Sequence, residues 1–216
     1  AMEEKKIMEK VLGPYKIILL GGISVGKTCL LNRYMKEFFA DNQPATLTGT
    51  FESKQVWVPE TGSHIKINVW DTFGEEKFRS YIKMYFKDVT AAILCFDLTS
   101  NDDFGKLPGW IDYIDECIDR SKIGVVLCGC KCDLEDDREV EYRKANKFAK
   151  ENNMKYYETS AKENTGVSYM FEQICKEISL NPVAKNASAA KGQKLKAPEE
   201  TEPEKRSIVK WMTGLC

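Results

Sequence analysis

The sequence predicts an α/β fold in which a mostly parallel central sheet, with one antiparallel strand, carries helices on both faces. Two observations lead to this prediction. Short runs dense in Ile, Leu, Val and aromatic residues alternate with segments of helical periodicity, and several of these runs are apolar at almost every position. Continuously apolar strands are typical of parallel sheets that helices cover on both sides.

Each predicted element rests on its own pattern. The predicted strands are residues 15–20, 54–58, 65–70, 91–96 and 123–127. Residues 59–62 (PETG) lie between the second and third strands and are typical of a hairpin turn, so these two strands are expected to be antiparallel. Near the end of the domain Val167, Phe171, Ile174 and Ile178 recur at helical spacing and predict one apolar helix face.

Composition narrows the class of protein. The chain has 216 residues, 43% of them hydrophobic and 30% charged, which is typical of one globular domain. Lys and Arg total 32 against 33 Asp and Glu, so the net charge of −1 gives no reason to expect a nucleic-acid partner. No apolar run approaches the roughly 20 residues of a membrane span. Residues 1–10 lack the apolar core of a signal peptide, so a cytoplasmic protein is expected.

The chain contains eight cysteines, and Cys95, Cys128, Cys130 and Cys132 lie in or just after apolar runs. Without a signal peptide, buried thiols are expected here rather than disulfides. The spacing of Cys128, Cys130 and Cys132 differs from the C-x2-C of zinc sites, so a metal site on these three residues is disfavoured. The single histidine, His64, is expected on a surface strand.

Residues 21–28 (GGISVGKT) form the strongest motif. They follow the predicted strand 15–20 and precede a helical pattern, as the phosphate-binding motif G-x4-G-K-[ST] requires. Its glycines let backbone N–H groups turn inward, and the following helix adds a positive N-terminal dipole. Lys27 places a charge at the β- and γ-phosphates, and the Thr28 hydroxyl can bind Mg²⁺. The motif predicts a site for a nucleoside phosphate.

Two further motifs bear on the base, residues 129–134 (GCKCDL) and 158–162 (ETSAK), and a third lies at residues 70–76 (WDTFGEE). With the phosphate loop they make the sequence resemble the Ras superfamily of small GTPases, and most closely its Rab family, over residues 13–180. The resemblance implies a Ras-type P-loop domain that binds GTP or GDP with Mg²⁺. It also implies a switch in vesicle traffic, peripheral on the cytosolic face of an endomembrane.

The resemblance also assigns residues. Asp133 matches the family's aspartate that accepts hydrogen bonds from guanine N1–H and the 2-amino group; adenine offers neither donor, so ATP is disfavoured. Catalytic roles are implied for Glu75 and Lys27. Nucleotide contacts are implied at Ser24, Val25, Gly26, Lys27, Thr28, Cys29, Phe39, Thr46, Gly74, Cys130, Lys131, Asp133, Ser160, Ala161 and Lys162, and magnesium contacts at Thr28, Thr46 and Asp71.

Partners follow from the same resemblance. Effectors, exchange factors and activating proteins are expected at the two switch regions. Phe51, Trp70 and Tyr85 match the three aromatics of Rab effector surfaces. The alternative interpretation of these aromatics is the edge of a hydrophobic core.

Four residues depart from the family pattern. Glu75 replaces the glutamine that orients the attacking water, and an ionised carboxylate cannot donate to phosphate oxygens. Ile23 and Phe73 replace small residues beside the phosphates, where bulk crowds the water and any arginine from an activating protein. Cys130 replaces the asparagine that ties the base motif to the phosphate loop, and a thiol is a weak partner. We expect slow hydrolysis and weakened nucleotide affinity.

Two alternative functions follow from these departures and motifs. A pseudo-GTPase, which is a binding module with little turnover, is favoured by the four departures but opposed by the intact Lys27, Thr28, Asp71 and Asp133. An ATP-dependent P-loop enzyme is disfavoured by Asp133, because adenine lacks the N1–H and 2-amino donors that this carboxylate would accept from.

The composition changes at Asn181-Pro182. We expect an N-terminal extension at residues 1–12, a small GTPase domain at 13–180 and a flexible C-terminal tail at 181–216. The tail carries seven Lys or Arg against four Glu, and its apolar residues Ile208, Trp211, Met212 and Leu215 recur at helical spacing. This pattern predicts a membrane-surface segment. By analogy with Rab proteins, prenylation is expected at Cys216, although that residue is not a C-a-a-X box.

Overall fold

A computed structural model describes residues 11–41, 43–44, 46, 49–72, 74 and 82–180 of the chain. Within these residues six strands form one sheet in the order β2-β3-β1-β4-β5-β6. Only the β2–β3 pair in this sheet is antiparallel, so the predicted mostly parallel sheet is confirmed. The strands are β1 (Val11–Leu20), β2 (Thr50–Val58), β3 (Ser63–Asp71), β4 (Val89–Asp97), β5 (Gly124–Cys130) and β6 (Lys155–Thr159).

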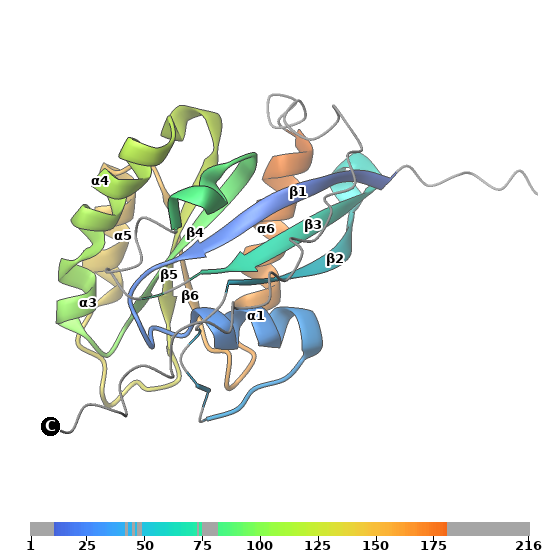
Figure 1. Cartoon of the computed structure of the whole chain (residues 1–216). Helices are drawn as coiled ribbons and strands as arrows, with labels where there is room; N and C mark the ends of the chain where they lie inside the picture. Colours follow the sequence, from blue (N-terminus) through green and yellow to red (C-terminus); the bar gives the residue numbers. More distant parts are fainter. Residues whose placement is uncertain are drawn as a thin grey trace, which may run out of the picture.

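Helices cover both faces of the sheet, as predicted (Figure 1). Helices α1 and α6 pack on one face, and α3, α4 and α5 pack on the other. The helices are α1 (Lys27–Lys36), α3 (Asn101–Gly105), α4 (Leu107–Cys117), α5 (Tyr142–Glu151) and α6 (Val167–Leu180), with short 3₁₀ turns η1 (Pro59–Thr61), η3 (Lys83–Phe86) and η4 (Arg120–Lys122). Among the described residues, none of the helices is long and apolar enough to cross a bilayer.

The central strand β1 shows why its sequence is continuously apolar. Ile17 and Leu19 belong to the core beneath α1 and α6, whereas Ile18 and Leu20 belong to the core beneath α4. Because successive side chains of a strand point to opposite faces, a strand covered on both faces needs apolar residues at every position. Strand β4 is buried over its whole length for the same reason.

Two other predicted elements are also confirmed. Residues 59–62 connect β2 to β3, with Val58 opposite Ser63, and Gly62 ends the 3₁₀ turn in a left-handed conformation with φ of 56°. The apolar stripe of α6 is buried, and Phe171 stacks on Tyr34 of α1 with ring centroids 3.8 Å apart.

Strand boundaries differ from the predictions. Strand β2 begins at Thr50 rather than residue 54, β3 and β4 each extend beyond their predicted ranges at both ends, and β5 ends at Cys130 rather than residue 127. Strand β1 begins at Val11 rather than Tyr15, because residues 11–12 also pair with β3. Strand β5 begins at Gly124 rather than Ile123. Strand β6 was not predicted from the sequence: its polar and aromatic residues are mostly half-buried, and pairing with β5 along one edge holds them extended.

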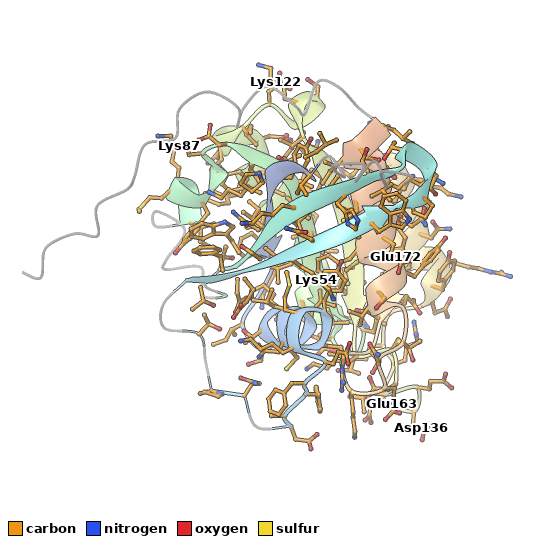
Figure 2. The ribbon with its side chains drawn as sticks, turned by 90° about the vertical axis from the view of Figure 1, so that its right-hand side faces the viewer. Lys54, Lys87, Lys122, Asp136, Glu163 and Glu172 are labelled. Atoms are coloured by element: carbon orange, nitrogen blue, oxygen red, sulfur yellow. The ribbon has the colours of Figure 1, made fainter. Side chains whose placement is uncertain are left out.

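The sheet topology creates a ligand-binding edge. Strand β1 lies between β3 and β4, so the connections that follow β1 and β3 run to opposite sides of it. In open α/β sheets, ligands bind outside the carboxyl ends of the strands at such a switch point. Figure 2 shows Asp136 and Glu163, which follow β5 and β6, at one end of the molecule, with Lys87 and Lys122, which precede β4 and β5, at the other.

Candidate nucleotide-binding site

A cavity of about 410 Å³ lies at the carboxyl end of the sheet. Its volume is within the range of roughly 300–1,000 Å³ typical of small-ligand sites. Segments that are far apart in the sequence meet in its wall, namely the phosphate loop, residues 39–46, residues 130–134 and residues 159–162. The sheet topology therefore brings the separate sequence motifs together around one space.

The phosphate loop requires glycine at both of its ends. Gly21 has φ of 133°, and a Cβ there would lie 2.1 Å from the Cys95 carbonyl oxygen. Gly26 has φ of 110° and precedes α1 at its N-cap position. Only glycine adopts these conformations without strain, so the backbone turns tightly and the N-terminus of α1 faces the cavity.

Lys27 is buried within this loop. Its ammonium donates to the Gly21 carbonyl oxygen at 3.0 Å and to the Gly22 carbonyl oxygen at 2.5 Å. Burial lowers the pKa of Lys27, and the nearby Cys95 and Asp71 oppose that effect. The loop carbonyls thus hold a positive charge at the end of the cavity that the phosphate loop forms.

Thr28, Thr46 and Asp71 meet although 43 residues separate the first from the last. The Thr28 hydroxyl donates to Asp71 Oδ2 at 2.6 Å, the Thr46 hydroxyl lies 3.2 Å from the same oxygen, and the two hydroxyl oxygens are 2.8 Å apart. Asp71 is 1% exposed, and this burial raises the pKa of its carboxyl group. The hydrogen bonds from Thr28 and Thr46 and the charge of Lys27 lower that pKa, but burial outweighs them.

This cluster fits a magnesium ion. Among the described residues, Asp71 Oδ1 is a buried oxygen without a hydrogen-bond partner. One carboxylate and two hydroxyls are hard oxygen donors, which Mg²⁺ prefers. A divalent cation here would supply the positive charge that the buried carboxylate otherwise lacks.

The base-motif residues line the same cavity. Lys131 lies in the wall in a left-handed conformation, and its ammonium donates to Asp97 Oδ2 at 2.5 Å. The other oxygen of Asp97 accepts from the backbone N–H and hydroxyl of Thr99. Asp133 and Phe39, both half-buried, also line the cavity.

Arg33 ties helix α1 to the loop after β6. Its guanidinium donates to the carbonyl oxygens of Ala161 at 2.5 Å and Lys162 at 3.1 Å, and also to the Glu37 carbonyl at the end of α1. Arg138 makes two hydrogen bonds of 2.9 Å to the carboxylate of Glu158, in the strand that leads into this loop. Two arginines therefore hold β6 and the start of the loop that follows it.

Comparison with known proteins identifies the fold family. A family model described as the Ras family matches residues 16–180. The chain belongs to the Ras family. It is 37% identical to the Ras-related protein Rab-30 of Homo sapiens over 179 residues, which cover 81% of this chain and 87% of Rab-30.

Two other relatives of this Ras-family chain are also Rab proteins. The Ras-related protein RabJ of Dictyostelium discoideum is 39% identical over 166 residues, 77% of this chain and 64% of RabJ. The Ras-related protein Rab-17 of Mus musculus is 38% identical over 168 residues, 76% of this chain and 77% of Rab-17. The Rab-like resemblance read from the motifs is confirmed.

Most of the implied site residues of this Ras-family domain lie in the cavity wall. The wall contains Ser24, Gly26, Lys27, Thr28, Cys29, Phe39, Thr46, Gly74, Cys130, Lys131, Asp133, Ala161 and Lys162. Val25 is instead buried in the core beneath α1 and α6. The Ser160 hydroxyl accepts from the Glu163 N–H at 2.9 Å. Val25 and Ser160 therefore stabilise the loops that form the wall, through core packing and a hydrogen bond respectively.

The departures from the Ras-family pattern have structural consequences. Ile23 is 51% exposed and lines the cavity. Gly74 packs against the phosphate loop so closely that a Cβ there would lie 2.6 Å from both the Gly22 carbonyl oxygen and Ile23 Cα. The Cys130 sulfur lies 3.9 Å from the Cys128 sulfur, within the sheet. The implied catalytic Glu75 and the bulky Phe73 lie outside the described residues.

The three aromatics matched to Rab effector surfaces form one cluster. Phe51 stacks on Trp70 with centroids 4.6 Å apart, and Trp70 lies 5.5 Å from Tyr85. Phe51 is 49% exposed, whereas Trp70 and Tyr85 are half-buried and pack against the core beneath α4. Lys16 places its ammonium 4.8 Å from the Trp70 ring. The cluster therefore has both an exposed face and a core-facing side.

Some functional residues escaped the sequence analysis. Asp97 is the partner of Lys131, and its position at the carboxyl end of a buried strand is a signal that could have found it. Arg33 gave no such signal, because its partners are backbone carbonyls 128 and 129 residues away. The predicted tail 181–216, with its membrane segment and Cys216, and residues 1–10 of the predicted extension lie outside the described residues.

Proposed function

We propose that this Rab-like protein is a molecular switch that binds GTP and GDP with Mg²⁺ and hydrolyses GTP slowly. The observation that carries the proposal is one cavity whose wall contains Lys27, Thr28, Thr46 and Asp133, with both threonines hydrogen-bonded to the buried Asp71. These groups offer a cation for phosphates, oxygen ligands for a metal, and a carboxylate for a base with two donors.

The phosphate end would act mainly through electrostatics. Bound Mg²⁺ would neutralise charge on the phosphate oxygens, with Thr28, Thr46 and Asp71 as the residues that hold it. Lys27 is held among the loop carbonyls and needs only a short movement to meet a phosphate. The inward-turned backbone after Gly21 and the N-terminus of α1 add partial positive charge.

The base end would select guanine. A partly buried carboxylate at Asp133 gains two hydrogen bonds from guanine and none from adenine, and sites built to bind polar groups reject analogues that lack them. Lys131, fixed by Asp97, can lay its stem along the base. Ala161 and Lys162, fixed by Arg33, complete this wall.

Slow hydrolysis follows from Glu75 and Ile23. Glu75 cannot donate to developing phosphate charge while it is ionised. The exposed side chain of Ile23 stands in the cavity where water and an activating arginine need room. Both residues leave binding possible and reduce the rate of the chemical step.

The deciding experiment identifies the nucleotide that is released when freshly purified protein is denatured. GTP would indicate binding with little hydrolysis, as proposed, whereas GDP would show an ordinary hydrolytic cycle. Single-turnover hydrolysis should rise in Glu75→Gln combined with Ile23→Ser and stay unchanged in Glu116→Gln, which makes the same chemical change on the exposed surface of α4. Equal rates in all three proteins would refute this explanation of slow turnover.

The switch would act on membranes through partner proteins. We propose that effectors and regulators contact both switch regions and the Phe51–Trp70–Tyr85 cluster, and that the tail 181–216, lipidated at Cys216, holds the domain (residues 13–180) at a cytosolic membrane face. The exposed face of Phe51 supports the first part. Capture of GTP-dependent partners by the protein, and its loss in Phe51→Ala, would test it.

A second candidate is a pseudo-GTPase scaffold. The Cys130 thiol is directed to Cys128 rather than tying the base motif to the phosphate loop, which favours weak nucleotide binding. Protein that is purified empty and fails to take up added GDP would support this candidate. Tighter GDP binding in Cys130→Asn would show that the thiol is the cause.

A further inference from the structure

Three buried thiols lie together directly beneath the phosphate loop. Cys95 of β4 pairs in register with Cys128 of β5, and Cys130 follows two residues later on the same face of the sheet. Their sulfur atoms all lie within 4.8 Å of one another, and those of Cys128 and Cys130 are 3.9 Å apart. The Thr159 hydroxyl oxygen of β6 lies 3.3 Å from the Cys128 sulfur.

These separations suit a metal ion bound through sulfur. A zinc–sulfur distance of about 2.3 Å in a tetrahedral site places ligand sulfurs about 3.8 Å apart. We propose that Cys95, Cys128 and Cys130 form a three-thiolate site for one thiophilic divalent cation of the zinc class, with the Thr159 hydroxyl beside the fourth position. This site is separate from the oxygen cluster of Thr28, Thr46 and Asp71.

The charges around the thiols favour such an ion. Three thiolates and a divalent cation leave one negative charge, and the buried Lys27 ammonium interacts with both Cys95 and Cys130. Hydrogen bonding among the three thiols lowers the pKa of Cys128 and raises the pKa of Cys95 and Cys130. Metal binding would release the remaining thiol protons to solvent, as at other thiolate sites.

Another buried cysteine of the same core lies outside this cluster. Cys175 of α6 is fully buried, but it is not among the sulfurs that lie within 4.8 Å of one another. Such a residue packs as a small apolar side chain. The convergence of three sulfurs and a hydroxyl, rather than burial itself, sets the Cys95–Cys128–Cys130 cluster apart.

The route to the thiols runs through the nucleotide cavity. Cys130 and Thr159 line that cavity, and a Cβ at Gly26 would lie 3.4 Å from Cys130 Cβ, so the cluster touches the phosphate loop. A metal ion therefore enters when the cavity is empty. Binding of the metal and binding of the nucleotide should therefore hinder each other. This competition would be a property of the site in addition to the switch function proposed above.

The test uses the full chain, stripped of nucleotide, desalted and titrated with Cd²⁺ alone. Cadmium bound to thiolates gives an ultraviolet charge-transfer band that oxygen ligands do not give. Cadmium bound at the Thr28–Thr46–Asp71 cluster would therefore not contribute to this band. We expect one such ion per chain. Loss of a ligand in Cys95→Ser or Cys128→Ser should weaken binding by more than the roughly 10–100-fold that loss of an outer hydrogen-bond partner costs.

Matched controls are Cys175→Ser, a buried cysteine outside the cluster, and Cys117→Ser, a half-buried one on α4. Both should keep the band at full strength. Absence of the band in the wild-type chain, or its survival in both cluster variants, would overturn the proposal. The titration of the wild-type chain tests the metal site even if a variant fails to fold. Because the measurement involves no guanine nucleotide, absence of metal binding would not count against the proposed switch function.

Discussion

At the scale of single residues, Arg33 shows how one side chain can join two distant loops. Arg33→Met keeps the apolar stem and removes the guanidinium that holds Ala161 and Lys162. Hydrogen bonds to charged groups contribute about 1.5–3 kcal/mol. Since about 1.4 kcal/mol is tenfold, GDP dissociation, followed with a fluorescent analogue, should accelerate about tenfold. Arg143→Met, on the exposed face of α5, is the control; an unchanged rate in Arg33→Met would contradict the role.

The buried carboxylate of Asp71, an expected magnesium ligand, should lower the stability of the nucleotide-free protein. Burial raises its pKa, so the folded chain binds a proton there more readily than the unfolded chain does. The ionised carboxylate therefore destabilises the nucleotide-free protein at neutral pH, and this effect disappears as the pH falls below the pKa of Asp71. Asp71→Asn should raise the free energy of unfolding in urea at neutral pH, with a smaller gain in acid.

The same Asp71→Asn variant should lose magnesium-dependent nucleotide binding, because the anionic oxygen ligand is gone. Asp112→Asn makes the equivalent change on the exposed face of α4 and should alter stability by less than about 0.5 kcal/mol. A variant that is less stable than wild type at neutral pH would show that hydrogen bonds to Thr28 and Thr46 outweigh the burial of charge.

Residues in contiguous motifs were predictable, whereas residues joined only by the fold were not. Lys27 and Thr28 stand at fixed spacing in one loop, so the sequence itself places them near phosphates. The cluster of Cys95 with Cys128 and Cys130 depends on the register between β4 and β5. The sequence analysis considered Cys128 and Cys130 with Cys132, and disfavoured a metal site there; the structure groups the first two with Cys95 instead.

At the scale of elements, helix α6 should carry much of the stability of its face of the sheet. Phe171 is fully buried and stacks on Tyr34. Phe171→Ala should lower the free energy of unfolding by about 3–5 kcal/mol, because deletion of a buried ring leaves a cavity. Urea denaturation would measure this. Tyr169→Ala, whose side chain is 59% exposed on the same helix, should cost less than about 1 kcal/mol. Equal losses would contradict the packing argument.

Elements with a strong periodic pattern were predictable, and the others depended on tertiary contacts. The stripe of α6 and the apolar run of β4 match their environments on both faces of the sheet. Strand β6 has no such pattern, since Tyr156, Tyr157 and Glu158 are half-buried at a sheet edge. The Arg138 guanidinium, from a separate segment, and the Tyr156 hydroxyl, from the same strand, both donate to Glu158 and stabilise the carboxyl end of β6.

At the scale of the whole molecule, one sheet separates two apolar cores and carries the cavity at its carboxyl edge. The cavity wall draws on loops that follow β1, β5 and β6, so a ligand there contacts segments anchored in both cores. A ligand that binds only the folded chain stabilises it by mass action. Nucleotide binding should therefore be visible in the thermal unfolding of the whole domain.

Guanine nucleotide should stabilise the chain and adenine nucleotide should not. GDP with Mg²⁺ at about 100 times its dissociation constant contributes about 2.7 kcal/mol. For a chain of this size, about 2–4 °C per kcal/mol gives a rise in melting temperature of about 5–10 °C. ADP should give none, because adenine lacks the N1–H and 2-amino donors that Asp133 would accept from. Asp133→Asn should remove the response to GDP, whereas Asp137→Asn, on the exposed part of the same loop, should keep it. Equal shifts with GDP and ADP would mean that the base end of the cavity does not read guanine.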